Sequence, residues 1–235
     1  MFTESAAFYD AIYSFKDYAA EAAQIAALVR ASCPHARSIL DVACGTGEHA
    51  RHLVASHGFE VDGLDLDAGL LRVARDKHPS GQFFLADMSD FTLPKRYDVV
   101  LCLFSSIGYL VTLDRIERAL ACFRRHLRPD GVLLVEPWLP PGSLDEGRVT
   151  RQTGTHDGGM VERVTRYEID GRISRLVFEY RIETADGTRH ATEIHELGLF
   201  TAEEMAAAFE GAGFRAEFDS HGLIGRGLWR ARSAA

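Results

Sequence analysis

The sequence of 235 residues has few of the features that mark secreted, membrane-bound or metal-binding proteins. Its four cysteines form no Cys-x-x-Cys pair, so neither a zinc site nor a disulfide framework is indicated. No apolar run approaches the ~18 residues of a membrane span, and the first residues lack the basic and apolar regions of a signal peptide. We therefore expect a cytoplasmic protein that has free cysteines and no membrane partner.

Basic residues are also in the minority, because 26 Lys and Arg stand against 34 Asp and Glu and leave a net charge of −8. Nucleic-acid binding needs clustered cations to neutralise phosphates, so this balance argues against it. A small phosphorylated ligand needs only one or two well-placed cations and is compatible with this charge. The hydrophobic share of 46% is ordinary for a globular protein, and the length predicts one or two domains.

Short apolar runs alternate with amphipathic segments over the first 136 residues. The predicted strands cover residues 38–43, 61–65, 83–85, 97–103 and 131–136. The predicted helices cover residues 18–31, about 48–57, 67–78 and 113–127. Strands separated by helices of this length are typical of an α/β fold, in which a doubly wound, mostly parallel sheet carries helices on both faces.

The pattern changes after Trp138. Asp-Gly sequences, which favour tight hairpins, occur at 157–159, 170–171 and 186–187. Between the last two, apolar side chains alternate with polar ones at Leu176, Phe178, Tyr180 and Ile182, as in a half-buried antiparallel strand. We interpret residues 145–198 as an antiparallel meander inserted into an α/β domain made of residues 1–144 and 199–235. Its apolar face predicts a homodimer interface or, alternatively, a lid over the site.

The chain after the meander predicts one helix and two strands. Thr201 to Glu204 form a capping-box sequence that opens a helix to about Ala212. The two final strands are expected near 214–219 and 226–231.

The stretch from Asp41 to Gly47 joins the first strand to the following helix. Gly45 and Gly47 let the backbone turn sharply and approach a ligand at the helix N-terminus. Asp65 ends the second strand, 18 residues beyond Gly47, where its carboxylate can accept hydrogen bonds from both ribose hydroxyls. Asp87 and Met88 follow the third strand at the same carboxyl edge.

Two nucleoside cofactors are compatible with this spacing. Gly45-x-Gly47-x-x-Ala50 satisfies the dinucleotide fingerprint, which leaves NAD as an alternative. Asp41, however, is an acid at the end of the first strand and would repel a pyrophosphate, whereas it would attract an ammonium group. With Asp65 and Asp87, it gives the crevice three carboxylates, which favours S-adenosylmethionine (SAM) over NAD.

Several of these segments resemble class I SAM-dependent methyltransferases, which have a Rossmann-like fold. The general resemblance is carried by LDVACGTG at 40–47, Asp65, Asp87 and LRPDGVLLVE at 127–136. More specific segments resemble the N,N-dimethyltransferases of desosamine and mycaminose: KDYAAEA at 16–22, DMSDF at 87–91, LFSSIGYL at 103–110, VEPW at 135–138 and GRGL at 225–228. Those enzymes methylate the 3-amino group of a dTDP-linked deoxysugar, and the resemblance implies a role in antibiotic biosynthesis.

The resemblance also implies roles for individual residues. At the methionyl end of SAM, Tyr9 and Tyr18 would flank the ligand, and Ala43, Gly45 and Leu103 would offer backbone groups, Leu103 near the methionyl amine. Asp65 would hold the ribose. Leu66 and Met88 would bracket the adenine, and Asp87 would accept a hydrogen bond from the adenine amino group. On the substrate side, Ser106, Tyr109, Trp138 and Arg226 would face the nucleotide sugar. The family sequences EPWWFP and SGRGLF become EPWLPP at 136–141 and IGRGLW at 224–229, so the sugar is left open.

The expected reaction is an in-line methyl transfer that needs alignment above all and leaves S-adenosylhomocysteine. Tyr109, neutral at an ordinary pKa of about 10, is predicted to orient the acceptor amine. Arg226, between two glycines, is predicted to anchor a pyrophosphate. A methyltransferase acting on another amine or a hydroxyl, and a non-catalytic SAM-binding module, are the alternatives.

No functional role is predicted for the histidines. His49 and His52 share a helix face but have no evident carboxylate or cysteine partner, so no metal site is predicted. His190 and His195 lie in the meander and are expected at the surface.

Overall fold

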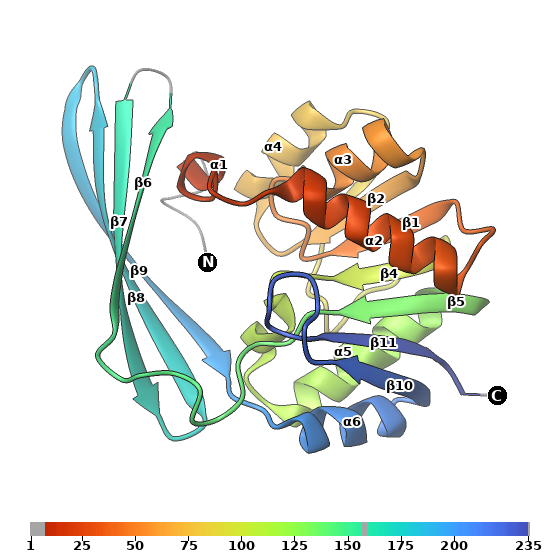
Figure 1. The fold of residues 1–235 in the computed structure, drawn as a ribbon. Coiled ribbons are helices and arrows are strands. Elements are labelled where there is room, and N and C mark those ends of the chain that lie inside the picture. Colours follow the sequence, from red (N-terminus) through yellow and green to blue (C-terminus); the bar gives the residue numbers. More distant parts are fainter. Residues whose placement is uncertain (1–7, 157–158, 235) are drawn as a thin grey trace.

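The computed structural model describes residues 8–156 and 159–234, which form two separate sheets (Figure 1). The larger sheet has seven strands in the order β10-β11-β5-β4-β1-β2-β3. Its strands are β1 (Ser38–Val42), β2 (Glu60–Asp65), β3 (Phe83–Leu85), β4 (Tyr97–Cys102), β5 (Leu127–Val135), β10 (Phe214–Asp219) and β11 (Leu228–Ser233). Strand β11 runs antiparallel to both of its neighbours, β10 and β5, and the other four pairings are parallel. The predicted doubly wound, mostly parallel sheet is therefore confirmed.

Helices cover both faces of this sheet. They are α2 (Tyr18–Ser32), α3 (Glu48–His57), α4 (Ala68–Lys77), α5 (Leu113–His126) and α6 (Ala202–Gly211). Along β4, Val99 and Leu101 pack in the cluster of α2 and α3, while Val100 and Cys102 pack in the cluster of α5 and α6. Because a central parallel strand is buried on both faces, its sequence is a continuous apolar run without alternation. No helix within the two described ranges is long and apolar enough to span a bilayer.

The order of the strands places a crevice at one edge of the large sheet. From β1 the chain moves outward to β2 and β3, then crosses to β4 and β5 on the other side. The carboxyl ends of β1 and β4 thus lie at the point where the winding direction reverses, and ligands of such sheets bind there. In Figure 1 the arrowheads of β4 and β5 point from this edge towards the smaller sheet.

The predictions made for the end of the chain had different outcomes. The capping box is present, because Thr201 Oγ1 accepts from the Glu204 amide and the Glu204 carboxylate accepts from the Thr201 amide. The last strand, expected from residue 226, begins instead at Leu228. Gly225 and Gly227 have φ angles of +81° and +85°, so the backbone around Arg226 turns and is not extended.

The smaller sheet is a four-stranded antiparallel meander. It consists of β6 (Val149–His156), β7 (Gly159–Asp170), β8 (Ile173–Thr184) and β9 (Gly187–Gly198). The Asp-Gly sequences at 170–171 and 186–187 lie at its last two turns, whereas Asp157 and Gly158 lie outside the described residues. The side chains of Leu176, Phe178, Tyr180 and Ile182 are buried, as predicted for one face of β8.

A short helix that the sequence did not reveal, α1 (Tyr9–Ile12), covers this apolar inner face. Figure 1 shows α1 between the smaller sheet and the α/β core. The outer face carries ion pairs, among them Arg166 with Glu179 and Arg175 with Glu196. The chain itself thus covers the apolar face on which the sequence predicts a homodimer interface or a lid.

Gly154 on β6 lets α1 approach the sheet. A Cβ atom added at this position would lie 2.2 Å from the carbonyl oxygen of Ala11, which is closer than atoms can pack. The backbone of α1 therefore rests directly on β6.

We predict that Gly154→Ala lowers the free energy of unfolding by about 1–3 kcal/mol, the usual effect of overpacking, when measured by urea denaturation. Gly211→Ala is the matched control, because a Cβ there meets no atom within 4 Å. Equal stability of the two variants would contradict the close approach of α1 to β6.

Candidate functional site

A cavity of about 700 Å³ lies between the carboxyl edge of the large sheet and the inner face of the meander. A recess of about 40 Å³ adjoins it. The predicted residues that line the cavity are Tyr9, Ala43, Gly45, Asp65, Leu66, Asp87, Met88, Ser106, Tyr109, Trp138 and Arg226. Tyr18, Asp41 and Leu103 line the recess. Gly47 lines neither; it is the N-cap of α3, where a Cβ would lie 3.2 Å from the Cβ of Ala74.

The loop after β1 is held in a strained shape by Asp65. Ala43, Gly45 and Gly47 all have positive φ angles, and for Ala43 this is a sparsely populated conformation. Asp65 Oδ2 accepts from the Gly45 amide at 2.8 Å, and Oδ1 accepts from the Asp67 amide at 2.9 Å. Burial raises the pKa of this carboxyl group. Asp65 therefore fixes the glycine loop in addition to lining the cavity.

Asp41 lines the recess and has a buried carboxylate oxygen, Oδ2, without a hydrogen-bond partner among the described residues. Its side chain is on β1 and only 2% exposed. Burial raises the pKa of Asp41 to about 6. A buried carboxylate is costly unless it is paired, so this position fits a cationic group such as the ammonium of SAM.

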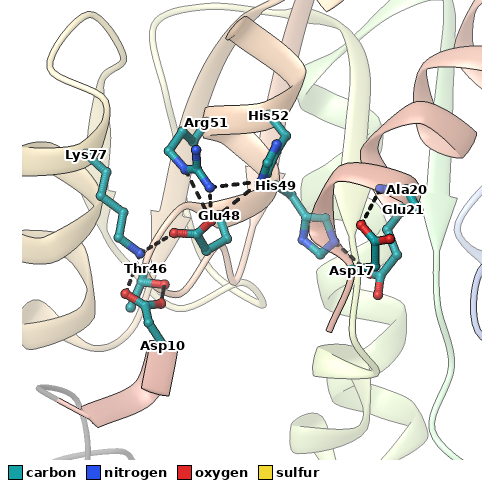
Figure 2. Close-up of polar contacts among 10 residues, drawn as sticks. All are labelled: Asp10, Asp17, Ala20, Glu21, Thr46, Glu48, His49, Arg51, His52 and Lys77. Atoms are coloured by element: carbon teal, nitrogen blue, oxygen red, sulfur yellow. Dashed lines mark hydrogen bonds and ion pairs between the residues drawn. The ribbon is translucent and has the colours of Figure 1, made fainter. Parts of the chain in front are cut away.

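A polar network ties α1 to the glycine loop and to two helices (Figure 2). Asp10 accepts from Thr46 Oγ1 at 2.6 Å and from Lys77 Nζ at 2.5 Å. Lys77 also donates to Glu48 at 2.6 Å. These contacts fasten α1, and with it Tyr9, over the cavity.

His49 takes part in a second network rather than in a metal site. It lies 2.9 Å from Glu21, which is also paired with Lys16, and its ring packs against Tyr18. His52 instead contacts Arg51 (Figure 2). In the described part of the chain, no group of three His, Cys, Asp or Glu side chains is placed to hold a metal ion.

The turn after β4 is also strained, and Glu136 holds it. Phe104 and Ser105 have φ angles of +51° and +61°. The Phe104 amide donates to Glu136 Oε2 at 2.6 Å, and Ser105 Oγ donates to the carbonyl of Pro137 at 2.7 Å. Strained turns of this kind cluster at ligand sites, and this one leads into the 3-10 helix η2 (Ser106–Leu110), which carries two of the predicted residues.

Asp87 already has partners for both carboxylate oxygens. Oδ1 accepts from the amide and hydroxyl of Ser89, and Oδ2 accepts from Arg115 at 2.8 Å. Hydrogen bonds from Ser89 and the nearby Arg115 outweigh partial burial and lower the pKa of Asp87. An adenine amino group would have to share this carboxylate with Arg115.

Arg226 lies between two aromatic rings. Its guanidinium carbon is 5.2 Å from the ring centre of Phe104 and 5.4 Å from that of Trp138, and Nη1 donates to Ser105 Oγ at 3.2 Å. Trp138 is itself fixed, because its Nε1 donates to Ser174 Oγ at 2.8 Å. The guanidinium lines the cavity close to both rings, where its N–H groups can donate to an anion.

The surface position expected for His195 is wrong. The side chain is 1% exposed, packs on Phe178, and its Nδ1 lies 2.9 Å from the hydroxyl of Tyr109. Along β9 the side chains of Glu193, His195 and Leu197 point inward in alternation. Because Glu193 and His195 are polar, this alternation does not show as a hydrophobic pattern in the sequence.

Arg163 is a second residue that the sequence did not single out. It is on the inner face of β7, only 5% exposed, and lines the cavity. Nη1 donates to the hydroxyl of Tyr13 at 2.8 Å, while Nε has no hydrogen-bond partner in the described structure. A buried guanidinium thus adds a positive charge to the meander side of the cavity.

Comparisons with known proteins agree with this arrangement. A family model described as a methyltransferase domain matches residues 39–131. A dTDP-3-amino-3,6-dideoxy-alpha-D-glucopyranose N,N-dimethyltransferase from Streptomyces fradiae is 43% identical over 229 residues, which cover 96% of this chain and 89% of the relative.

Two solved structures share the whole fold. DesVI from Streptomyces venezuelae has a TM-score of 0.87 and 39% identity, over 95% of this chain and 97% of DesVI. SAM-bound CalS10 from Micromonospora echinaspora, an amino pentose methyltransferase, has a TM-score of 0.82 and 35% identity, over 93% of this chain and 92% of CalS10. The chain therefore belongs to the methyltransferase family that contains these sugar N-methyltransferases.

Proposed function

We propose that the protein is a SAM-dependent N-methyltransferase that methylates the amino group of a dTDP-linked amino-deoxysugar. The observation that carries this proposal is a single cavity lined by groups of both charges. Its acidic end is formed by Asp65 and Asp87 at the sheet edge, with Asp41 in the adjoining recess. Guanidiniums line the cavity at Arg163 on the meander and at Arg226 in the loop between β10 and β11. A cationic donor and an anionic nucleotide sugar have charges complementary to these two sets of groups.

The acidic end suits SAM and not a dinucleotide. We assign the ammonium of SAM to Asp41 and its ribose to Asp65, and we assign the adenine to the space between Leu66 and Met88. Tyr9 and Tyr18 would enclose the methionyl end, next to Ala43, Gly45 and Leu103. When bound, SAM supplies a methyl group that its sulfonium charge has already activated.

The other end suits the acceptor. Arg226 would hold the pyrophosphate, with Ser106 and Trp138 beside the nucleotide sugar. Tyr109 would orient the amine, since its ring forms part of the cavity wall and its hydroxyl is held by His195. The protein's main contribution is then to align the acceptor with the donor and to exclude water.

Two further proposals concern the setting of this reaction. We infer that the enzyme works in the cytoplasm, in line with its four free cysteines. We also retain a homodimer as a prediction, but on the outer face of the meander, where Val149 and Ile194 are exposed.

The test is incubation of the protein with SAM and a panel of dTDP-aminosugars, followed by mass spectrometry. We expect products heavier by one or two methyl groups. Turnover of the matched hydroxy sugars alone would make the protein an O-methyltransferase, and unchanged SAM with every acceptor would make it a binding module.

The pKa of Asp41 predicts how SAM binding depends on pH. A cation favours the ionised carboxylate, which predominates above pH 6, so SAM affinity should fall as the pH drops from 7.5 to 5. Asp41→Asn should weaken binding at pH 7.5 by about 1.5–3 kcal/mol, the scale of a charge-assisted hydrogen bond, and should reduce the pH dependence. Calorimetric titration measures both, and an unchanged affinity at pH 7.5 would rule out this contact.

Arg226→Ala should raise KM for the nucleotide sugar by about tenfold to a hundredfold, equivalent to about 1.4–2.8 kcal/mol, and leave SAM affinity unchanged. Arg230→Ala is the matched control, because Arg230 pairs with Glu217 on the exposed part of the same segment. If the two variants have the same KM, the pyrophosphate is held elsewhere, and Arg163 becomes the next candidate.

A further inference from the structure

We propose that Tyr109, His195 and Glu193 form a proton relay that removes a proton from the acceptor amine. The inference rests on the proposed function and adds a step to it. The Tyr109 hydroxyl lies 2.9 Å from His195 Nδ1, and His195 Nε2 lies 3.5 Å from a carboxylate oxygen of Glu193. The three groups form a line from the cavity wall into the interior of the meander.

The chain of contacts begins at the cavity and ends at a buried carboxylate. Tyr109 is 36% exposed and His195 is 1% exposed, and both line the cavity, whereas Glu193 is 7% exposed and is not part of the lining. Leu176, Phe178 and Leu197 on the same inner face are apolar. Burial of an imidazole beside a carboxylate has a desolvation cost, which a role in proton transfer would explain.

The relay requires one tautomer of His195. In this tautomer Nε2 carries the proton and faces Glu193, and Nδ1 accepts from the Tyr109 hydroxyl. Burial lowers the pKa of His195, with Arg163 lowering it and Glu193 raising it. Burial raises the pKa of Tyr109, reinforced by Tyr13, Tyr180 and Asp65 and opposed by Arg163. At neutral pH the phenol is thus protonated and the imidazole is neutral, so that Nδ1 can accept a hydrogen bond from the phenol.

The acceptor must lose a proton before it can attack the methyl group. An alkyl ammonium with a pKa of about 10 has no free lone pair at pH 7. In the relay, the ammonium proton passes to the Tyr109 oxygen while the Tyr109 hydroxyl proton passes to His195 Nδ1. The amine regains its lone pair, Tyr109 remains a phenol, and the imidazolium is stabilised by the Glu193 carboxylate. The proton returns to solvent through Tyr109 after the product leaves.

The same step recurs if the enzyme methylates twice. Transfer of the first methyl group leaves a secondary ammonium, which must lose a proton before it can attack again. His195 is therefore a positioning and proton-accepting residue that acts through Tyr109, and its loss should affect the second methylation as well as the first.

The test compares His195→Asn with the wild-type enzyme by following kcat, KM and the ratio of mono- to dimethylated product from pH 7 to pH 9. The asparagine oxygen can accept from Tyr109 but cannot take up a proton. We expect kcat at pH 7 to fall about 100-fold, the scale of general base catalysis, with little change in KM or SAM affinity. The deficit should shrink about tenfold for each pH unit, and monomethylated product should accumulate at pH 7.

His190→Asn is the matched control, because His190 is exposed on the same strand, and it should behave as wild type. Tyr109→Phe should reproduce the pH-dependent loss, and adding His195→Asn to it should have little further effect. If His195→Asn does not fold, Glu193→Gln and Tyr109→Phe are compared instead. The relay predicts a pH-dependent loss of kcat in both variants.

A kcat equal to that of wild type, or a loss that is the same at pH 7 and pH 9, would overturn the relay while wild-type turnover still supports the proposed function. Failure of the wild-type enzyme to methylate any aminosugar would overturn the proposed function itself, and the relay with it.

Discussion

The site depends on the contact between the apolar inner face of the meander and the carboxyl edge of the parallel sheet. This contact, made through α1 and η2, turns an open crevice into a cavity. Burial raises the pKa of Asp41 to about 6, and Nε of the buried Arg163 has no hydrogen-bond partner among the described residues. In such surroundings, charges on a ligand interact more strongly than they would in water. A donor and an acceptor of opposite charge can therefore be held in one compartment.

Much of this arrangement could be predicted from the sequence, because it depends on patterns within short segments. The apolar runs predict the central strands, and the glycines after Asp41 predict the turn at the first of them. Since parallel strands end at one edge, Asp41, Asp65 and Asp87 were expected together, and they line the cavity or its recess. Residues taken from the family resemblance, such as Trp138 and Arg226, lie there as well. Their contacts with ligands stay predictions.

What the sequence could not reveal depends on pairing between distant segments. His195 is buried because β9 turns it towards Tyr109, which lies 86 residues earlier in the chain. Arg163 meets Tyr13 across 150 residues. The helix α1 has four residues, too few for a periodic pattern, and forms where the meander gives it a surface. The predicted start of β11 was wrong because the sequence does not reveal the positive φ angles of Gly225 and Gly227, which delay the strand.

The most direct test is a crystal structure with S-adenosylhomocysteine and a dTDP-aminosugar bound together. Our account predicts the adenosine beside Asp65 and Met88, the pyrophosphate at Arg226, and the sugar amine within hydrogen-bond distance of the Tyr109 hydroxyl, all in the cavity between the two sheets. A nucleotide sugar bound on the outer face of the meander, or with its amine turned away from the cofactor, would contradict the account.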